Sequence, residues 1–242
     1  YASNLVARYV ASGWLESPAR GVYLRKGGHL SWQGVLRALQ AGEDLPLHAG
    51  GRFALAWRGH EHYLRLGTSA TVTLYGPTPL PGWAGKLPLK ERLVGCGKGP
   101  FDFPTLCFSG EPADEVLRER GLERVAHDGE VEGLVFATPE RAMLELCDAP
   151  ADAALVYEAD ALMQGMANLR PKRVETLLCH CVSIKAKRLF LALAERHAHA
   201  WLPHVSLDGV DLGRGKRALV PGGRLHPTYH ITLPADLDEQ LG

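Results

Sequence analysis

The sequence predicts an α+β fold. Three features support this prediction: an amphipathic segment followed by two brief apolar runs near the N-terminus, a β-branched and aromatic run at residues 71–75, and two well-delimited helical patterns in the second half of the chain. Strand-like runs follow the second of those helices. Together these elements indicate a small N-terminal unit and a larger mixed α/β C-terminal domain.

The segment from Ser3 to Gly13 predicts a short helix. Ser3 is a good N-cap, and Gly13 is suited to end the helix. The large apolar residues share one side of it: Leu5, Val6, Tyr9 and Val10. The other side carries small residues and hydrogen-bond donors of the kind that reach base edges and phosphates: Asn4, Ala7, Arg8 and Ala11.

Two short strands are predicted after this helix, at residues 14–16 and 22–24, and a proline and a glycine favour a turn between them with Arg20 at its tip. A helix followed by a hairpin with a basic tip is the second half of a winged helix-turn-helix. We expect the first helices of that motif before Tyr1, where the given sequence begins. An ordinary amphipathic helix and hairpin with surface arginines would fit the same pattern.

The predicted DNA-binding residues lie on this helix and hairpin, and they are Ser3, Asn4, Arg8, Arg20, Tyr23, Arg25 and Lys26. We expect Asn4 and Arg8 to reach the major groove or adjacent phosphates. The hairpin cations are expected to contact mainly phosphates, and Tyr23 either packs under the wing or touches the DNA backbone.

Charge is distributed unevenly along a chain whose formal net charge is zero. Residues 1–100 carry twelve Lys and Arg against five Asp and Glu, residues 101–160 carry four against fifteen, and residues 161–242 carry eleven against seven. The basic N-terminal part indicates a polyanion as partner. No apolar run approaches the roughly 20 residues of a membrane helix, and five cysteines without a regular framework favour a reducing, cytoplasmic location.

The middle of the chain provides a predicted domain boundary. Ser31 is suited to cap a helix over residues 32–39, residues 53–57 suggest another short helix, and residues 71–75 suggest a strand. The proline-rich stretch at 77–90 is a plausible connection. We therefore expect a winged helix-turn-helix domain at residues 1–75 and a C-terminal domain at residues 76–242.

The C-terminal half contains two clear helix starts. Thr138 is followed by a proline and a glutamate, which suit the first turn of a helix, and its apolar residues Met143, Leu144 and Leu146 are expected to face inward. Ser183 begins a second helix with an apolar stripe at Ala186, Leu189, Phe190 and Leu193. Residues 212–220 and 229–233 predict strands separated by a turn at residues 221–223.

Six cations form two basic clusters in this half: Lys185, Lys187, Arg188, Arg214, Lys216 and Arg217. One interpretation is a contact surface for nucleic acid, or for an acidic partner or substrate. The other is a solvated helix face followed by a charged loop.

No catalytic, metal-binding or cofactor-binding motif is predicted. The Cys179-His180-Cys181 run, with Cys147 further off, lacks the paired spacing of zinc sites, and His60-Glu61-His62 lacks metalloprotease spacing. The glycine-rich stretch at 95–99 fits no nucleotide-binding fingerprint. A nuclease-like metal site would draw on the remaining acidic candidates: Glu130, Glu132, Asp208 and Asp211.

The stretch "ARYVASGWLESPARGVYLRKG" resembles the N-terminal winged helix of AbiE-type antitoxins, the AbiEi family of type IV toxin–antitoxin systems. The similarity continues in "SWQGVLRALQ", "LPLHAGGRFALAWRGHEHYL" and "TVTLYGP", and later in "ATPERAMLELC", "LRPKRVETLLCHCVSIKAKRLFLALAERHAHAWL" and "DLGRGKRALVPGGRLHPTYHITLP". These pieces follow the family's order over most of the chain, with a weaker match at residues 84–133.

The resemblance implies two roles. The N-terminal domain is expected to bind inverted repeats of double-stranded DNA in its own promoter and to repress its operon. The C-terminal domain is expected to counteract a cognate nucleotidyltransferase-like toxin without forming a stable complex with it. The expected setting is defence against phage by abortive infection.

Two alternatives stay open at this point. The first is a winged-helix repressor whose C-terminal domain senses a ligand or dimerises. The second is a metal-dependent nuclease-like enzyme with a DNA-binding N-terminus. The six cations form an antitoxin surface only if they are the contact surface described above and the resemblance to AbiEi antitoxins holds.

Overall fold

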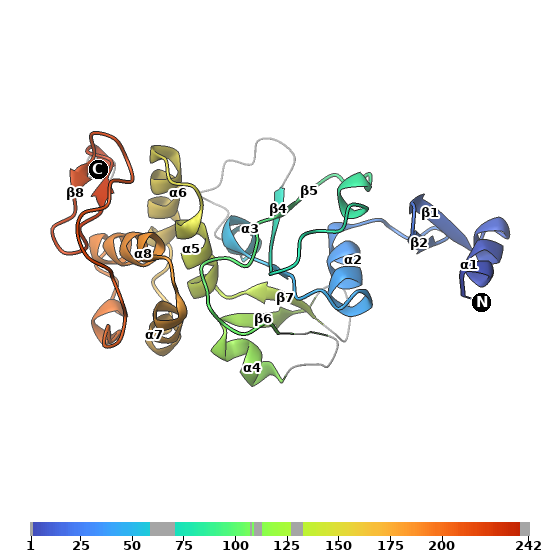
Figure 1. The fold of residues 1–242 in the computed structure, drawn as a ribbon, viewed down its shortest axis with the longest axis horizontal. Coiled ribbons are helices and arrows are strands. Elements are labelled where there is room, and N and C mark those ends of the chain that lie inside the picture. The colour runs from blue at the N-terminus through green and yellow to red at the C-terminus, as the bar shows by residue number, and fades with distance from the viewer. Residues whose placement is uncertain (1, 59–70, 107, 109–112, 127–132, 238–242) are drawn as a thin grey trace.

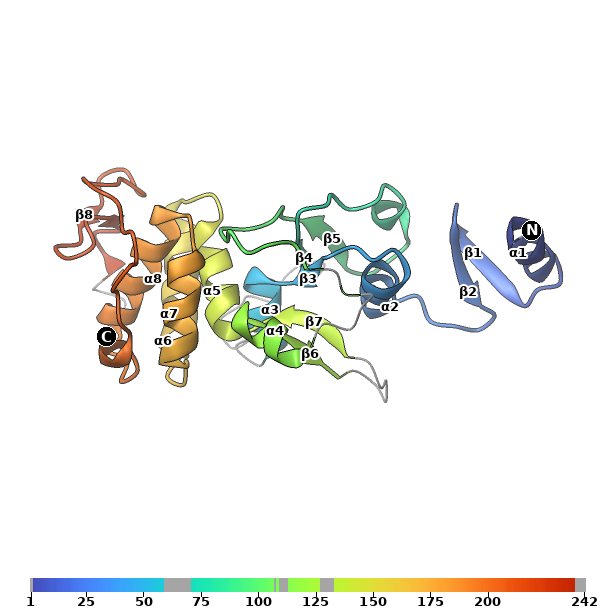
Figure 2. The ribbon, with the colours of Figure 1, turned by 60° about the horizontal axis from the view of Figure 1, so that its bottom comes forward.

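The computed structural model describes residues 2–58, 71–106, 108, 113–126 and 133–237. The molecule is elongated, with the N-terminal helix and hairpin at one end and the C-terminal segment at the other (Figure 1, Figure 2). Helices and strands are mixed along the chain, which confirms the α+β prediction. Within these ranges, no helix is both long and apolar enough to cross a membrane.

The N-terminal helix α1 (Ala2–Ala11) ends at the predicted glycine. The Trp14 N–H donates to the Tyr9 carbonyl at 3.0 Å, and the Gly13 N–H donates to the Val10 carbonyl at 3.1 Å. Gly13 has a φ of +72°, so these two bonds form a Schellman motif that needs a residue tolerant of the left-handed region.

The start of α1 differs from the prediction. The helix begins at Ala2, so Ser3 lies in its first turn and not at the N-cap. The predicted apolar side is only partly covered, because Leu5 and Tyr9 are 47% and 44% exposed. The opposite side is exposed as expected.

The predicted hairpin is confirmed. Strand β1 (Leu15–Ala19) pairs antiparallel with β2 (Val22–Arg25), and the register places Ala19 opposite Val22. Arg20 and Gly21 therefore form the tip of the hairpin. Residues 26–31 then lead to the rest of the molecule without forming a helix or strand.

The centre of the molecule is a five-stranded mixed sheet. Strand β3 pairs antiparallel with β4 and parallel with β7, β4 pairs parallel with β5, and β6 pairs antiparallel with β7. In spatial order the strands are β5 (Arg92–Gly95), β4 (Thr71–Tyr75), β3 (His48–Ala49), β7 (Leu134–Ala137) and β6 (Leu122–Val125).

Short helices surround this sheet. They are α2 (Trp32–Arg37) with a π-helical extension η1 (Ala38–Gly42), α3 (Gly51–Trp57), the 3₁₀ turn η3 (Ala84–Lys86) and α4 (Asp114–Glu119). The Ser31 hydroxyl accepts from the Gly34 N–H at 3.2 Å, so the predicted cap of α2 is confirmed. The Trp32 ring packs edge-on against Phe53 and Phe136, which joins α2 and α3 to β7.

The C-terminal helices pack around α5, which lies between them and the sheet (Figure 1, Figure 2). They are α5 (Pro139–Asp148), α6 (Ala153–Gln164), α7 (Pro171–His180), α8 (Ile184–Arg196) and the 3₁₀ turn η4 (Leu202–His204). Every residue from Glu140 to Cys147 is buried, so the three apolar residues predicted to face inward do so. The Ser183 hydroxyl caps α8 by accepting from the Ala186 N–H.

The C-terminal strands are shorter than predicted. Only β8 (Arg224–Leu225) and β9 (Thr232–Leu233) form a ladder, and Arg217 makes one isolated bridge with Ile231. Residues 212–220 do not form a strand, because Gly213 and Gly215 adopt φ values of +67° and +74° that break an extended run. The predicted turn is present, since the Gly223 N–H donates to the Val220 carbonyl at 3.2 Å.

Residues 32–75 share one core with the C-terminal half. Ala49 of β3 pairs with Phe136 of β7, and β4 pairs with β5 along its length. The predicted boundary at residue 75 thus runs through the sheet, and the proline-rich stretch at 77–90 is a crossover between two neighbouring parallel strands. The N-terminal helix lies at a distance from this sheet in both views (Figure 1, Figure 2), whereas Ala19 and Val22 beside the hairpin tip are partly buried against the main core.

Candidate nucleic-acid interface

The helix and hairpin expose almost all of the predicted DNA-binding side chains. Ser3 occupies the first turn of α1. The side chains of the other six members are exposed: Asn4, Arg8, Arg20, Tyr23, Arg25 and Lys26. Tyr23 is 48% exposed, so it does not pack under the wing. A contact with the DNA backbone is the expected role that stays a prediction.

The electrostatics of this unit favour a polyanion. Residues 2–27 hold four Lys or Arg and one acidic residue, Glu16. Within the described part of the chain, none of the four cations has an ion-pair partner. The ten residues of α1 span about 15 Å, and a DNA major groove about 12 Å wide admits an α-helix. The unit can therefore present one helix to a groove and a basic hairpin tip to the neighbouring phosphates.

Two members of the predicted antitoxin surface are buried. Lys187 and Arg188 are 3% and 2% exposed. The Arg188 guanidinium donates to the carbonyls of Leu212 and Gly215, each at 2.7 Å, and to that of His230 at 3.3 Å. Arg188 therefore fixes residues 212–215 onto α8. The prediction that it belongs to an exposed contact surface was wrong.

Lys185 also has a structural partner. Its ammonium group donates to the carbonyls of Asp148 and Ala149 at 2.7 and 2.5 Å. These carbonyls belong to the C-terminal end of α5, where a cation is stabilised by the helix dipole. Lys185 and Arg188 of the first basic cluster thus make structural contacts, and Lys187 is buried, so this cluster is not an exposed face.

Removal of the Lys185 ammonium group is expected to destabilise the protein. Lys185→Met keeps the aliphatic stem and loses the two charged hydrogen bonds, which should lower the free energy of unfolding by roughly 2 kcal/mol. Urea denaturation followed by circular dichroism measures this change. Lys172→Met is the matched control, because the Lys172 side chain is 90% exposed, and it should leave the free energy of unfolding essentially unchanged. Equal values for the two variants would contradict a structural role for Lys185.

The second basic cluster remains accessible. Arg214, Lys216 and Arg217 are all exposed on the segment that Arg188 holds. The Arg217 N–H donates to the His230 carbonyl at 2.9 Å, which fixes the backbone beneath these side chains. This loop is the part of the predicted antitoxin surface that solvent and a partner can reach.

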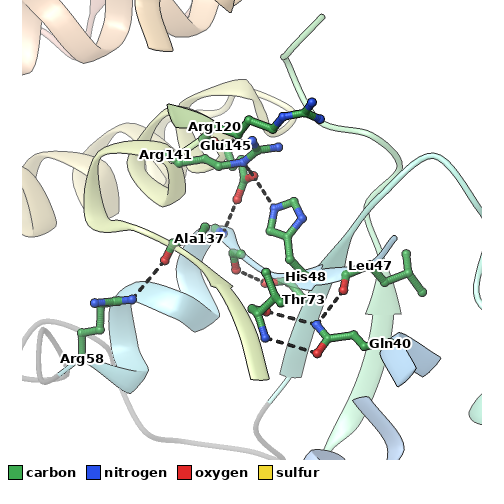
Figure 3. A network of polar contacts seen from close by, with 12 residues as sticks. Gln40, Leu47, His48, Arg58, Thr73, Arg120, Ala137, Arg141 and Glu145 are labelled. Carbon is green, nitrogen blue, oxygen red and sulfur yellow. Dashed lines mark hydrogen bonds and ion pairs between the residues drawn. The ribbon is translucent and has the colours of Figure 1, made fainter. Parts of the chain in front are cut away.

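A charged network that the sequence did not reveal lies inside the central core (Figure 3). The Glu145 carboxylate is completely buried and accepts from His48 Nε2 at 2.8 Å, Arg141 Nε at 2.8 Å and the Gly51 N–H at 2.9 Å. Gly50 lies against this carboxylate so closely that a Cβ there would collide with it. The network joins α5 to β3 and to the first turn of α3.

Burial and neighbouring charge set the protonation of this network. Burial lowers the pKa of His48, so its imidazole is neutral near pH 7. Burial alone would raise the pKa of Glu145, but the hydrogen bond from His48 together with the charge and hydrogen bond of Arg141 outweighs it and keeps that pKa below its usual value. A buried ionised carboxylate therefore faces the almost buried Arg141 cation.

The described residues do not assemble a metal site. They contain no group of three His, Cys, Asp or Glu side chains placed to hold a metal ion. The Cys179-His180-Cys181 run is split, because Cys179 is exposed and Cys181 is buried, which raises the pKa of the Cys181 thiol to about 11. Asp211 accepts from the Gly213 N–H in a local turn. The remaining candidates, at residues 60–62, 130 and 132, lie outside the described residues.

Two family models together span nearly the whole chain. A model described as "Transcriptional regulator, AbiEi antitoxin N-terminal domain" matches residues 1–66. A second, described as "Transcriptional regulator, AbiEi antitoxin, Type IV TA system", matches residues 69–234. The chain belongs to the AbiEi antitoxin family. The resemblance in the sequence is thereby confirmed, and the exposed basic end of this AbiEi antitoxin agrees with a transcriptional regulator.

A solved structure has a similar fold. The crystal structure of the Rv2827c protein from Mycobacterium tuberculosis matches with a TM-score of 0.57 and 16% sequence identity, over 99% of this chain and 83% of that chain. At this identity the likeness concerns the fold alone. A search of curated proteins finds no significant match.

Only one sequence signal pointed to the buried network of this AbiEi antitoxin. Arg141 and Glu145 are four residues apart in a helix start whose other residues are mostly apolar, which is the spacing of an intrahelical ion pair. Nothing local marks His48, which lies 97 residues before Glu145 in the chain. Its role depends on the pairing of β3 with β7.

Proposed function

We propose that this AbiEi antitoxin binds inverted repeats in its own promoter through residues 2–27 and thereby represses its operon. The observation that carries the proposal is the set of exposed cations on α1 and on the β1–β2 hairpin, none of which has an ion-pair partner among the described residues. On this proposal α1 lies in the major groove, with Asn4 and Arg8 near base edges or phosphates, and the hairpin cations lie on phosphates. The DNA-reading unit ends at the 26–31 connection, before the sheet begins.

An electrophoretic shift titration with DNA from upstream of its gene tests this function. We expect selective binding in two steps, because paired repeats carry two reading units, and weaker binding at higher salt. A scrambled DNA of equal length is the control. Equal affinity for both DNAs would reduce the helix and hairpin to a non-specific basic surface, and no binding to either would overturn the proposal.

We further propose that the C-terminal part opposes a cognate nucleotidyltransferase-like toxin without a stable complex. The accessible surface for this role is the loop with Arg214, Lys216 and Arg217, since the first basic cluster is occupied by structural contacts. Such a loop can attract an acidic partner or compete for a polyanionic substrate of the toxin.

Charge reversal on this loop should separate the two roles. A variant with glutamate at positions 214, 216 and 217 is expected to lose protection of toxin-expressing cells while it keeps promoter binding, because the loop lies far from α1 (Figure 1). Colony counts on toxin induction and the shift assay are the two measurements. Lys172→Glu is the control for an exposed cation elsewhere. Full protection by the folded triple variant would contradict this assignment.

A further inference from the structure

A surface pocket lies directly beside the buried Glu145 network. Its wall combines the glycine-rich loop at 96–99, the segment at 101–106 and the start of β6, with a volume of about 80 Å³. The glycine-rich loop matches no nucleotide-binding fingerprint, and the proposed DNA and antitoxin functions do not use it. Its position at this pocket suggests a role for it.

Three cations line the pocket: Lys98, Arg120 and Arg141. Arg141 is 7% exposed, and its Nε and Nη1 atoms bond to Glu145 and to the Arg120 carbonyl. No described residue accepts a hydrogen bond from its Nη2 atom. The guanidinium also lies 4.5 Å from the centre of the Phe101 ring, which holds it at the wall of the pocket.

The other two cations bring charge that no carboxylate balances. The Arg120 guanidinium donates to the carbonyl of Pro104, and Arg120 lines the same pocket as Arg141. Lys98 is exposed and has no ion-pair partner within the described ranges. It sits between Gly97 and Gly99, whose φ values of +69° and +71° let the loop turn tightly, and Gly99 lies close against the Tyr75 ring.

The acidic groups nearby are engaged elsewhere. Glu145 is enclosed by its three donors, and Asp102 pairs with His180 at 2.9 Å. Asp44 accepts from the Phe108 N–H at 3.2 Å. No carboxylate among the described residues lines the pocket, so two positive charges remain after Arg141 and Glu145 balance each other.

We propose that this pocket binds a phosphoryl group, either as inorganic phosphate or as the terminal phosphate of a phosphomonoester. A tetrahedral oxyanion presents several acceptor oxygens to a guanidinium edge and an ammonium group, which is the match that Arg and Lys make with phosphate. A water needs roughly 10–15 Å³ of such volume, so the pocket, at about 80 Å³, has room for a group of this size. The stacked rings of Phe101 and Phe103 form an apolar part of the pocket wall.

Calorimetric titration of the full chain in phosphate-free buffer with about 0.15 M sodium chloride tests the proposal, because this salt screens weak surface attraction. We expect saturable one-site binding of inorganic phosphate, weakened at least fivefold in Lys98→Ala and abolished in Lys98→Glu. Lys86→Ala is the matched control, since Lys86 is also exposed, also follows a glycine and does not line the pocket, and it should leave the binding unchanged.

A parallel titration with adenosine monophosphate distinguishes the two sources of the phosphoryl group. Tighter binding than phosphate, with the same dependence on Lys98, identifies a phosphomonoester. Equal or weaker binding identifies phosphate itself. Binding that does not saturate, or that falls equally in the Lys98 and Lys86 variants, would overturn the pocket as a site.

Discussion

Glu145→Gln is expected to lower the free energy of unfolding by about 3–5 kcal/mol at pH 7. The amide keeps the shape of the carboxylate but leaves the buried Arg141 cation without its counter-charge, and breaking one side of a buried pair costs about this much. Urea denaturation gives the value. The control is Glu158→Gln, whose partner Arg52 is half exposed, and it should cost no more than about 1 kcal/mol. Similar losses in the free energy of unfolding for both variants would show that burial of the Arg141–Glu145 pair does not increase the cost of removing its carboxylate.

The same variant should alter the dependence of stability on pH. The pKa of Glu145 is lowered in the folded protein, so its contribution is complete above its ordinary pKa of 4.5 and is lost as the pH falls below that value. The lowered pKa of His48 acts in the same sense, because below pH 6.5 the unfolded imidazole binds a proton that the folded one does not. Wild-type stability should therefore decline from about pH 6.5 downward, and its advantage over Glu145→Gln should shrink below pH 4.5.

Local signals in the sequence predicted the elements whose geometry is local. Ser31 and Ser183 cap their helices, and Gly13 ends α1, because a cap depends on three or four consecutive residues. The hairpin and the strand at 71–75 follow from turn chemistry and alternation in the same way. Exposure of the basic residues at positions 8, 20, 25 and 26 could also be predicted, because they flank short elements with little core.

Long-range pairing determines what the sequence did not reveal. Strand β3 has only two residues, and its partner Phe136 is 87 positions further along, so the chain pattern cannot show that residues 32–75 join the C-terminal core. Arg188 appeared to be on a solvated flank of α8, but a segment 24 or more residues later covers it and supplies backbone carbonyls as acceptors. A buried cation with carbonyl partners has the same local sequence as an exposed one.

Removal of the hairpin cations should almost abolish the electrostatic part of DNA binding. Each phosphate contact contributes about 0.9 to the slope of log affinity against log salt, so the variant with alanine at positions 20, 25 and 26 should flatten that slope by about 2.7. If the variant and the wild type bind equally at 1 M salt, where electrostatic attraction is screened, the variant should bind roughly two to three orders of magnitude more weakly than the wild type at 0.1 M. The loss should be the same for promoter and scrambled DNA, because phosphates carry no sequence information.

Two comparisons make this prediction specific to the hairpin. Alanine at positions 214, 216 and 217 removes the same charge at the opposite end of the molecule, and it should leave the slope within about half a unit of the wild type (Figure 1). Arg8→Ala should instead cost about 1–3 kcal/mol and relax the preference at one base pair if Arg8 reads a guanine. Equal slopes for the two triple variants would mean that net charge, and not the position of the wing, governs affinity.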